Sequence, residues 1–192
     1  MLVPLSIRRS VKACRETFLL VIFCAVVSLS ANYSAHAQRP KDPLTPDQEE
    51  QVRAVADQPD ERVKLYIKFI EERTEAIHHA VVRPVTQHPG VVIHDRLEEF
   101  TRLVDELQDN LDAYDESHSD VRKSLKILLE HSAKWTAVLE EPPGSPEYDF
   151  ARKSATDAVA STNEAATALL KSQVEYFSKH KAEKDVKKKS DD

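Results

Sequence analysis

The sequence predicts an all-α protein: an up-and-down antiparallel bundle of four main helices with a short leading N-terminal helix, after a cleaved signal peptide. In several stretches the apolar residues repeat at alternating steps of four and three, which is typical of helices that pack along a seam. Both glycines, Gly90 and Gly144, fall between these stretches, and no proline interrupts one. Short connections between consecutive helices favour antiparallel neighbours.

Residues 1–37 have the three parts of a secretory signal peptide. Four basic residues precede an apolar core at 18–29, and the small-x-small sequence at 35–37 gives a cleavage site before Gln38. The apolar run is too short to cross a bilayer comfortably. We therefore expect export by the general route and a periplasmic or secreted protein. Retention of this segment as a membrane anchor is the alternative.

The composition of the remaining chain excludes several kinds of chemistry and partner. Both cysteines, Cys14 and Cys24, lie in the signal segment, so the mature chain has no disulfide and no thiolate metal ligand. The first 37 residues hold four of the 27 basic residues and one of the 33 acidic ones, so the rest of the chain has a net charge of −9. This sign repels phosphate backbones, and we expect no nucleic-acid partner.

The leading helix is defined by its start signal. Residues 38–44 contain two prolines and are expected to form an extended tether. Thr45 and Gln48 have the spacing of a capping box, with Pro46 at the first helical position. The helix should end near Asp57, because a proline follows two residues later.

Four longer helices follow, at about 59–81, 93–115, 121–139 and 146–180, and prolines mark the connection at 82–92. The second of them has the clearest seam, formed by Ile93, Leu97, Phe100, Val104, Leu107, Leu111 and Tyr114. In the last helix, alanine and threonine replace the large apolar residues over most of the seam.

The ends of these helices set the domain boundaries. Ser117 or Ser119 is the expected cap of the helix at 121–139. The leading helix and the four longer ones together form a helical bundle domain of residues 45–180. The Lys-rich residues 181–192 are expected to be a disordered, solvated tail.

Folding consecutive helices back on each other about their connections predicts which residues share a level. Phe100 comes opposite Trp135, Trp135 comes opposite Ala151 or Arg152, and Thr74 comes near Phe100. With Ala151 in this layer, two large aromatic side chains face two small ones. The last helix is longer than its neighbours. Its final ten or so residues, roughly 15 Å of helix, overhang the connection at 117–119.

The overhang carries four apolar residues that need a cover: Leu170, Val174, Tyr176 and Phe177. We expect the leading helix to dock on them, as short helices do on apolar stripes. If it does not, the overhang is an exposed apolar patch, and such patches mark partner or self-association sites.

A group of histidines surrounds the connection at 82–92, namely His78, His79, His88 and His94. Imidazoles bind Zn²⁺, Cu²⁺ and Ni²⁺, so this group is the candidate metal site. Its spacing matches no known site, and the one Glu-x-x-His pair, Glu75 with His78, lacks the second pair that a di-metal bundle needs. We expect no cofactor, with a divalent transition metal as the alternative.

The sequence lacks the patterns of catalysis. It has no Gly-x-Ser-x-Gly, no mature cysteine nucleophile and too few glycines for a phosphate-binding loop. We therefore expect no enzyme activity. Membrane contact is expected only through the signal segment, or weakly through the Lys-rich tail.

These features indicate an exported, non-enzymatic helical-bundle protein of binding or assembly, with a protein partner or with a second copy of itself. One alternative is a metal-binding or metal-buffering periplasmic bundle that uses the histidines. Another is a membrane-tethered envelope structural protein whose signal segment is retained as an anchor.

The signal-peptide prediction is tested by the N-terminal sequence of the protein recovered from the cell that produces it. We expect the mature chain to begin at Gln38, because signal peptidase cleaves after a small-x-small sequence. A protein that still begins at Met1 and fractionates with membranes would contradict cleavage and support the anchor.

Overall fold

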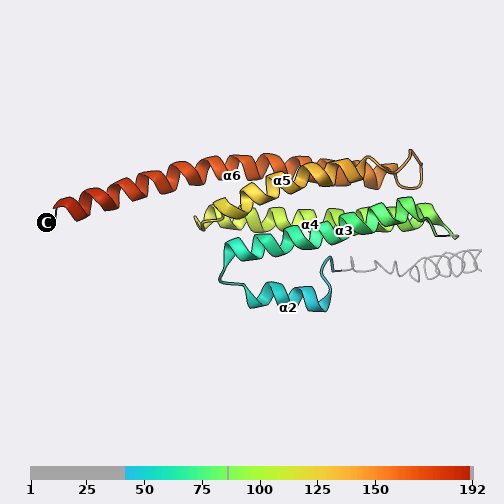
Figure 1. The fold of residues 1–192 in the computed structure, drawn as a ribbon, viewed down its shortest axis with the longest axis horizontal. Coiled ribbons are helices and arrows are strands. Elements are labelled where there is room, and N and C mark those ends of the chain that lie inside the picture. The colour runs from blue at the N-terminus through green and yellow to red at the C-terminus, as the bar shows by residue number, and fades with distance from the viewer. Residues whose placement is uncertain (1–41, 86, 191–192) are drawn as a thin grey trace, which may run out of the picture. The chain divides into compact units, whose positions relative to one another are not determined.

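The computed structural model describes residues 42–85 and 87–190, with side chains described as far as Lys181. The predicted signal peptide and most of the tether lie outside these ranges. Residues 42–192 form one compact unit. Its described part is all-helical and consists of α2 (Pro46–Ala54), α3 (Pro59–Val82), α4 (Pro89–Glu116), α5 (Arg122–Leu139) and α6 (Asp149–Ser190), as Figure 1 shows. Within the described ranges, no helix has the length and apolar character needed to span a membrane.

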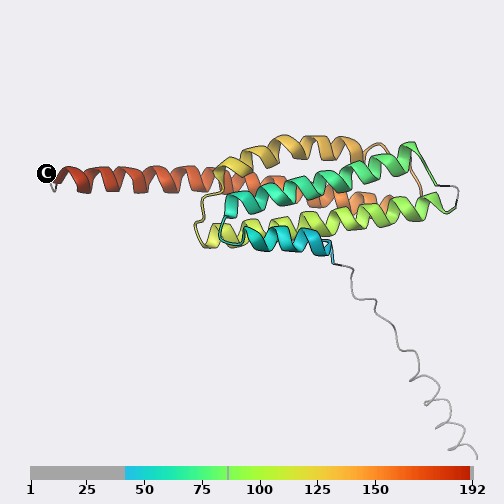
Figure 2. The ribbon, with the colours of Figure 1, turned by 60° about the horizontal axis from the view of Figure 1, so that its bottom comes forward.

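The four long helices pack so that each one contacts two others. α3 contacts α4 and α5, and α6 also contacts α4 and α5, so that α4 lies diagonally opposite α5 (Figure 2). Two polar contacts, from Asp60 to Ser124 and from Glu71 to His131, show that α3 and α5 run in the same direction. The short α2 packs on α3 alone among the described helices.

The predicted pairing of Phe100 with Trp135 is confirmed. The rings of Phe100 and Trp135 lie 6.4 Å apart between centroids in an edge-on arrangement, with an interplanar angle of 83°. Thr74 and Ala151 are both buried. Because α4 and α5 are diagonal, the two rings meet across the core rather than along a shared helix interface. Their large size is what allows them to reach each other.

The first helix start is as predicted, and the capping box is confirmed. The Thr45 hydroxyl accepts a hydrogen bond from the Gln48 N–H at 3.3 Å, and the Gln48 side chain accepts one from the Thr45 N–H at 3.0 Å. Pro46 occupies the first helical position, where its missing N–H costs nothing.

The cap predicted for the next-to-last helix is wrong. Neither Ser117 nor Ser119 caps α5, which begins at Arg122. The Ser124 N–H instead donates to the Asp60 carboxylate at 2.9 Å, and Asp60 belongs to the first turn of α3. Burial raises the pKa of Asp60, but hydrogen bonds from Lys64 and the Ser124 backbone outweigh it and hold the pKa below its ordinary value.

The connection between α3 and α4 is shorter than expected because α4 begins at Pro89. Gly90, the second residue of α4, is buried and faces Glu147 in the connection before α6. A Cβ at Gly90 would lie 1.5 Å from a Glu147 carboxylate oxygen. The first turn of α4 has no acidic residue of its own. Gly90 therefore leaves room for a carboxylate at the positive end of the α4 dipole.

α6 differs from its expected range at both ends. It begins at Asp149, after a turn in which the Ser145 N–H donates to Asp149 at 3.0 Å. It then continues to Ser190, past the predicted tail boundary at Lys181. Residues 181–190 contain no proline or glycine, and alanine, lysine and glutamate are good helix formers.

The predicted cover for the overhang is also wrong, since α2 packs on α3. Leu44 and Val52 are buried there, and polar contacts fix the position. Arg73 of α3 donates to the Gln48 amide oxygen at 3.0 Å and to the Pro43 carbonyl at 3.1 Å, and Gln48 donates to Glu72 at 2.8 Å.

We predict that Asp60→Ala lowers the free energy of unfolding by about 0.5–2 kcal/mol at pH 7, the usual cost of losing an N-cap. Since the folded-state pKa is depressed, this stabilisation is present above the unfolded pKa and is lost as the pH falls through the folded value. Urea unfolding at pH 7 and at about pH 3 should therefore show a difference that shrinks in acid. Asp57→Ala, in the exposed turn before α3, is the control and should have little effect.

Candidate functional site

The candidate site is the α6 projection, defined as residues 174–190, which extends beyond the ends of α4 and α5 (Figure 1). Gln173 marks its beginning. This side chain is 3% exposed, accepts a hydrogen bond from the Val121 N–H at 3.1 Å, and donates to the Ser119 carbonyl at 2.7 Å. Both partners lie in the connection between α4 and α5. Gln173 thus fixes the level at which α6 leaves the rest of the helices.

Just beyond Gln173, one side of α6 forms a hollow of about 600 Å³. We call it the α6 hollow; its lining residues are Arg122, Val174, Phe177, Ser178, His180 and Lys181. Val174 is 49% exposed, whereas Phe177 is half-buried beneath the Arg122 guanidinium, which lies 4.5 Å from the centre of its ring. The hollow therefore has an apolar floor and a positively charged rim.

Arg122 is held in place over this floor by its neighbour Asp120. It donates from Nε at 2.8 Å and from Nη2 at 2.7 Å, a two-pronged contact that fixes the guanidinium plane. These hydrogen bonds lower the pKa of Asp120 and raise that of Arg122. Fixing the plane favours stacking on the face of Phe177, a cation–π arrangement.

Tyr176 packs edge-on against Phe177, with 5.2 Å between the ring centroids and an interplanar angle of 89°. Its ring lies 4.4 Å from the ring of His118 and 4.0 Å from that of His180, between centroids. His118 has a left-handed backbone, with φ of 51°, in the connection that Gln173 also binds. Tyr176 therefore packs on this connection and supports Phe177 and His180, two of the residues that line the α6 hollow.

The structure divides the four residues predicted as a partner interface. Val174 and Phe177 line the α6 hollow, Tyr176 packs on the α4–α5 connection, and Leu170 packs against the core. Sequence reasoning missed five contributors: Arg122, Gln173, Ser178, His180 and Lys181. Apolar periodicity gives no signal for them because they are polar, although Gln173 continues the buried seam of α6 four residues after Leu169.

The four predicted metal-binding histidines do not come together. His78 contacts Glu141 at 2.6 Å and lies 6.0 Å from the His79 ring, between centroids. His94 contacts Asp95 at 3.4 Å and Glu98 at 3.7 Å, while exposed His88 precedes the first turn of α4 with φ of 48°. In the described ranges, no three His, Cys, Asp or Glu side chains are placed to hold a metal ion together.

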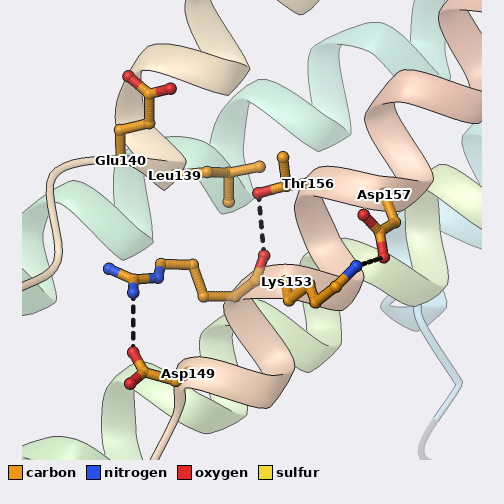
Figure 3. Close-up of a pocket in the computed structure, with 7 residues that line it drawn as sticks. Leu139, Glu140, Asp149, Lys153, Thr156 and Asp157 are labelled. Carbon is orange, nitrogen blue, oxygen red and sulfur yellow. Dashed lines mark hydrogen bonds and ion pairs between the residues drawn. The ribbon is translucent and has the colours of Figure 1, made fainter. Parts of the chain in front are cut away.

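A polar hollow of about 320 Å³ lies where α5 ends and α6 begins (Figure 3). The charged side chains contributed by α6 are engaged with each other. Arg152 donates to Asp149 at 2.8 Å and to the Pro142 carbonyl at 2.6 Å, and Lys153 pairs with Asp157. These contacts hold the first two turns of α6 and the preceding connection in place, which is a structural role.

The same end of α6 exposes a large aromatic residue. Phe150 is 84% exposed, the highest value among the exposed large apolar residues in the described ranges. It borders a smaller hollow of about 180 Å³, whose other lining residues are Glu98, Thr101, Arg102, Ala151 and Ser154. The sequence offered one signal for this exposure: Phe150 directly precedes Ala151, the first residue of the buried seam, and so lies off it.

Comparisons with known proteins add no family to this geometry, since no protein-family model, curated protein or solved structure matches the chain. Any assignment of function therefore depends on the α6 projection and its neighbours.

We predict that Gln173→Leu lowers the free energy of unfolding by about 1–3 kcal/mol, because it leaves the Val121 N–H and the Ser119 carbonyl without their partner. Urea unfolding measures this loss, and amide hydrogen exchange at Val121 should accelerate more than exchange in the middle of α3. The control is Gln51→Leu, at an exposed position on α2. Equal effects of the two substitutions would contradict the role given to Gln173.

Proposed function

We propose that this chain is an exported, non-enzymatic binding or assembly protein, and that its docking surface is the α6 hollow. The single observation that carries the proposal is the half-exposed Val174 beside Phe177 on a helix that projects past its neighbours. Apolar side chains left uncovered at such a place favour a partner, because docking removes them from water.

The same proposal includes the architecture that presents the surface. We propose that α3 to α6 form an up-and-down four-helix bundle after a cleaved signal peptide, with the α4–α5 connection crossing the bundle diagonal. The pairings of α3 with α4 and of α5 with α6 support it, as does the diagonal placement of α4 and α5. In this arrangement the α4–α5 connection lies at the end of the bundle from which α6 projects.

The chemistry of the hollow indicates what kind of surface it fits. The floor formed by Val174 and Phe177 suits an apolar side chain, and the Lys181 side chain at the rim suits a carboxylate. A partner surface with an exposed apolar residue among acidic residues matches both. Electrostatic attraction at an exposed rim of this kind weakens with added salt.

The test places a photo-activated cross-linking amino acid at position 174 in the cell that produces the protein. We expect an adduct of discrete mass from position 174, because the residue there lies on the docking surface. The matched control is position 91, since Val91 is 50% exposed on α4 and Val174 is 49% exposed. The adduct should weaken when Lys181→Glu is added. Equal cross-linking from the two positions, or none from 174, would refute the docking surface.

A further inference from the structure

Two apolar surface features of this protein, the exposed Phe150 side chain and the α6 hollow, lie near opposite ends of one helix. Phe150 projects at the start of α6, and the α6 hollow lies where the helix leaves its neighbours. Phe177 lies 27 positions after Phe150, a separation of about 40 Å along a straight helix. The two features therefore cannot meet within one chain, and any contact between them joins two chains.

Size and apolar character match between the two features. The α6 hollow, at about 600 Å³, is large enough to admit a phenyl side chain, and Val174 and Phe177 provide an apolar floor for it. An aromatic residue that enters such a pocket is the commonest kind of anchor in protein interfaces. Phe150 is exposed enough to enter without rearrangement of its own helix.

Charge favours the same pairing. Glu98, Glu147 and Asp149 lie on the elements around Phe150, where Arg102 and Arg152 pair with Glu98 at 3.6 Å and with Asp149 at 2.8 Å. At the hollow, Asp120 pairs with Arg122. The charges in these pairs cancel. Of the remaining side chains, Glu147 adds a negative charge on the Phe150 side, and Lys181 adds a positive charge on the hollow side.

Pairing the α6 hollow with itself is disfavoured. A two-fold axis through it would bring the Lys181 side chains of both chains close together, and like charges across an interface cost affinity. Phe150 against the hollow brings different surfaces together, so one copy of the pair keeps a free hollow and the other keeps a free Phe150. Such a contact is head-to-tail, and it adds chains without closing unless the rotation between copies completes a ring.

We propose that the occupant of the α6 hollow is Phe150 of a second copy of this chain, which gives a head-to-tail assembly. This rests on the proposed function, since it names the partner of the same docking surface. The α6 projection of one copy then lies beside the start of α6 in the next. Figure 1 shows these two segments at opposite ends of the helical unit, as an end-to-end arrangement requires.

The test uses two variants that each remove one side of the contact, Phe150→Asp and Phe177→Asp, studied by sedimentation and light scattering of the purified protein. We expect the wild-type mass to rise with concentration beyond two chains. Each variant alone should associate roughly tenfold or more weakly, as expected for loss of an interface anchor. An equimolar mixture of the two should form dimers and stop there, because the hollow of Phe150→Asp can take the intact Phe150 of the other variant.

Val174→Asp serves as a second hollow variant, since Val174 is half-exposed and its substitution leaves the core untouched. Phe150→Asp and Val174→Asp should again give dimers only when mixed. Gln51→Asp, at an exposed position on α2, should associate like the wild type, because α2 packs on α3 and, among the described helices, makes no contact with α6. Circular dichroism confirms that each variant keeps its helical content.

Three results would overturn the head-to-tail contact: a wild-type protein that stays monomeric, a wild-type assembly that stops at two chains, or a variant mixture that stays monomeric. A monomeric wild type that still gives a position-174 adduct of a mass other than two chains leaves the proposed function standing with a foreign partner. If the position-174 adduct is also absent, the proposed function fails together with the head-to-tail contact.

Discussion

The connection between α4 and α5 is the constraint on which the rest of this fold depends. It is short, yet it joins two helices that lie diagonally opposite each other, so its backbone polar groups cannot all be satisfied within α4 and α5. Side chains from the other two long helices complete them: Asp60 of α3 accepts from Ser124, and Gln173 of α6 bridges Val121 and Ser119. Because buried backbone groups without partners are costly, these contacts fix where all four helices begin and end relative to one another.

The small residues of α6 follow from the same arrangement. α6 contacts both α4 and α5, while the centre of the layer between them is occupied by the rings of Phe100 and Trp135. Buried Ala151 and Ala155 on α6 leave room for those two rings and let the helix approach closely. Large apolar residues return on α6 at Leu169, which is still buried, before the helix leaves the core at Gln173.

Apolar periodicity was sufficient to predict the helices and the level of the central layer, but not the contacts made by polar residues. Apolar seams and turn residues predict the ranges of α3 and α5 and the pairing of Phe100 with Trp135. They do so because burial selects one face of each helix. The cap of α5 was missed since Asp60 lies 64 residues away in sequence from Ser124. The docking of α2 on α3 was missed for a similar reason, as it depends on Arg73 and Gln48, whose pairing no local pattern reveals.

The placement of α2 has a direct consequence for the candidate site. A short helix on α3 covers part of the core and satisfies its own polar side chains there, so it is not available to shield α6. Phe177 then packs beneath the Arg122 guanidinium and, at 5.2 Å between ring centroids, against Tyr176, while Val174 stays 49% exposed in the α6 hollow. A polar residue at position 174 would keep the helix equally well solvated. The proposed docking surface gives Val174 a role, since removing its side chain from water would stabilise a complex.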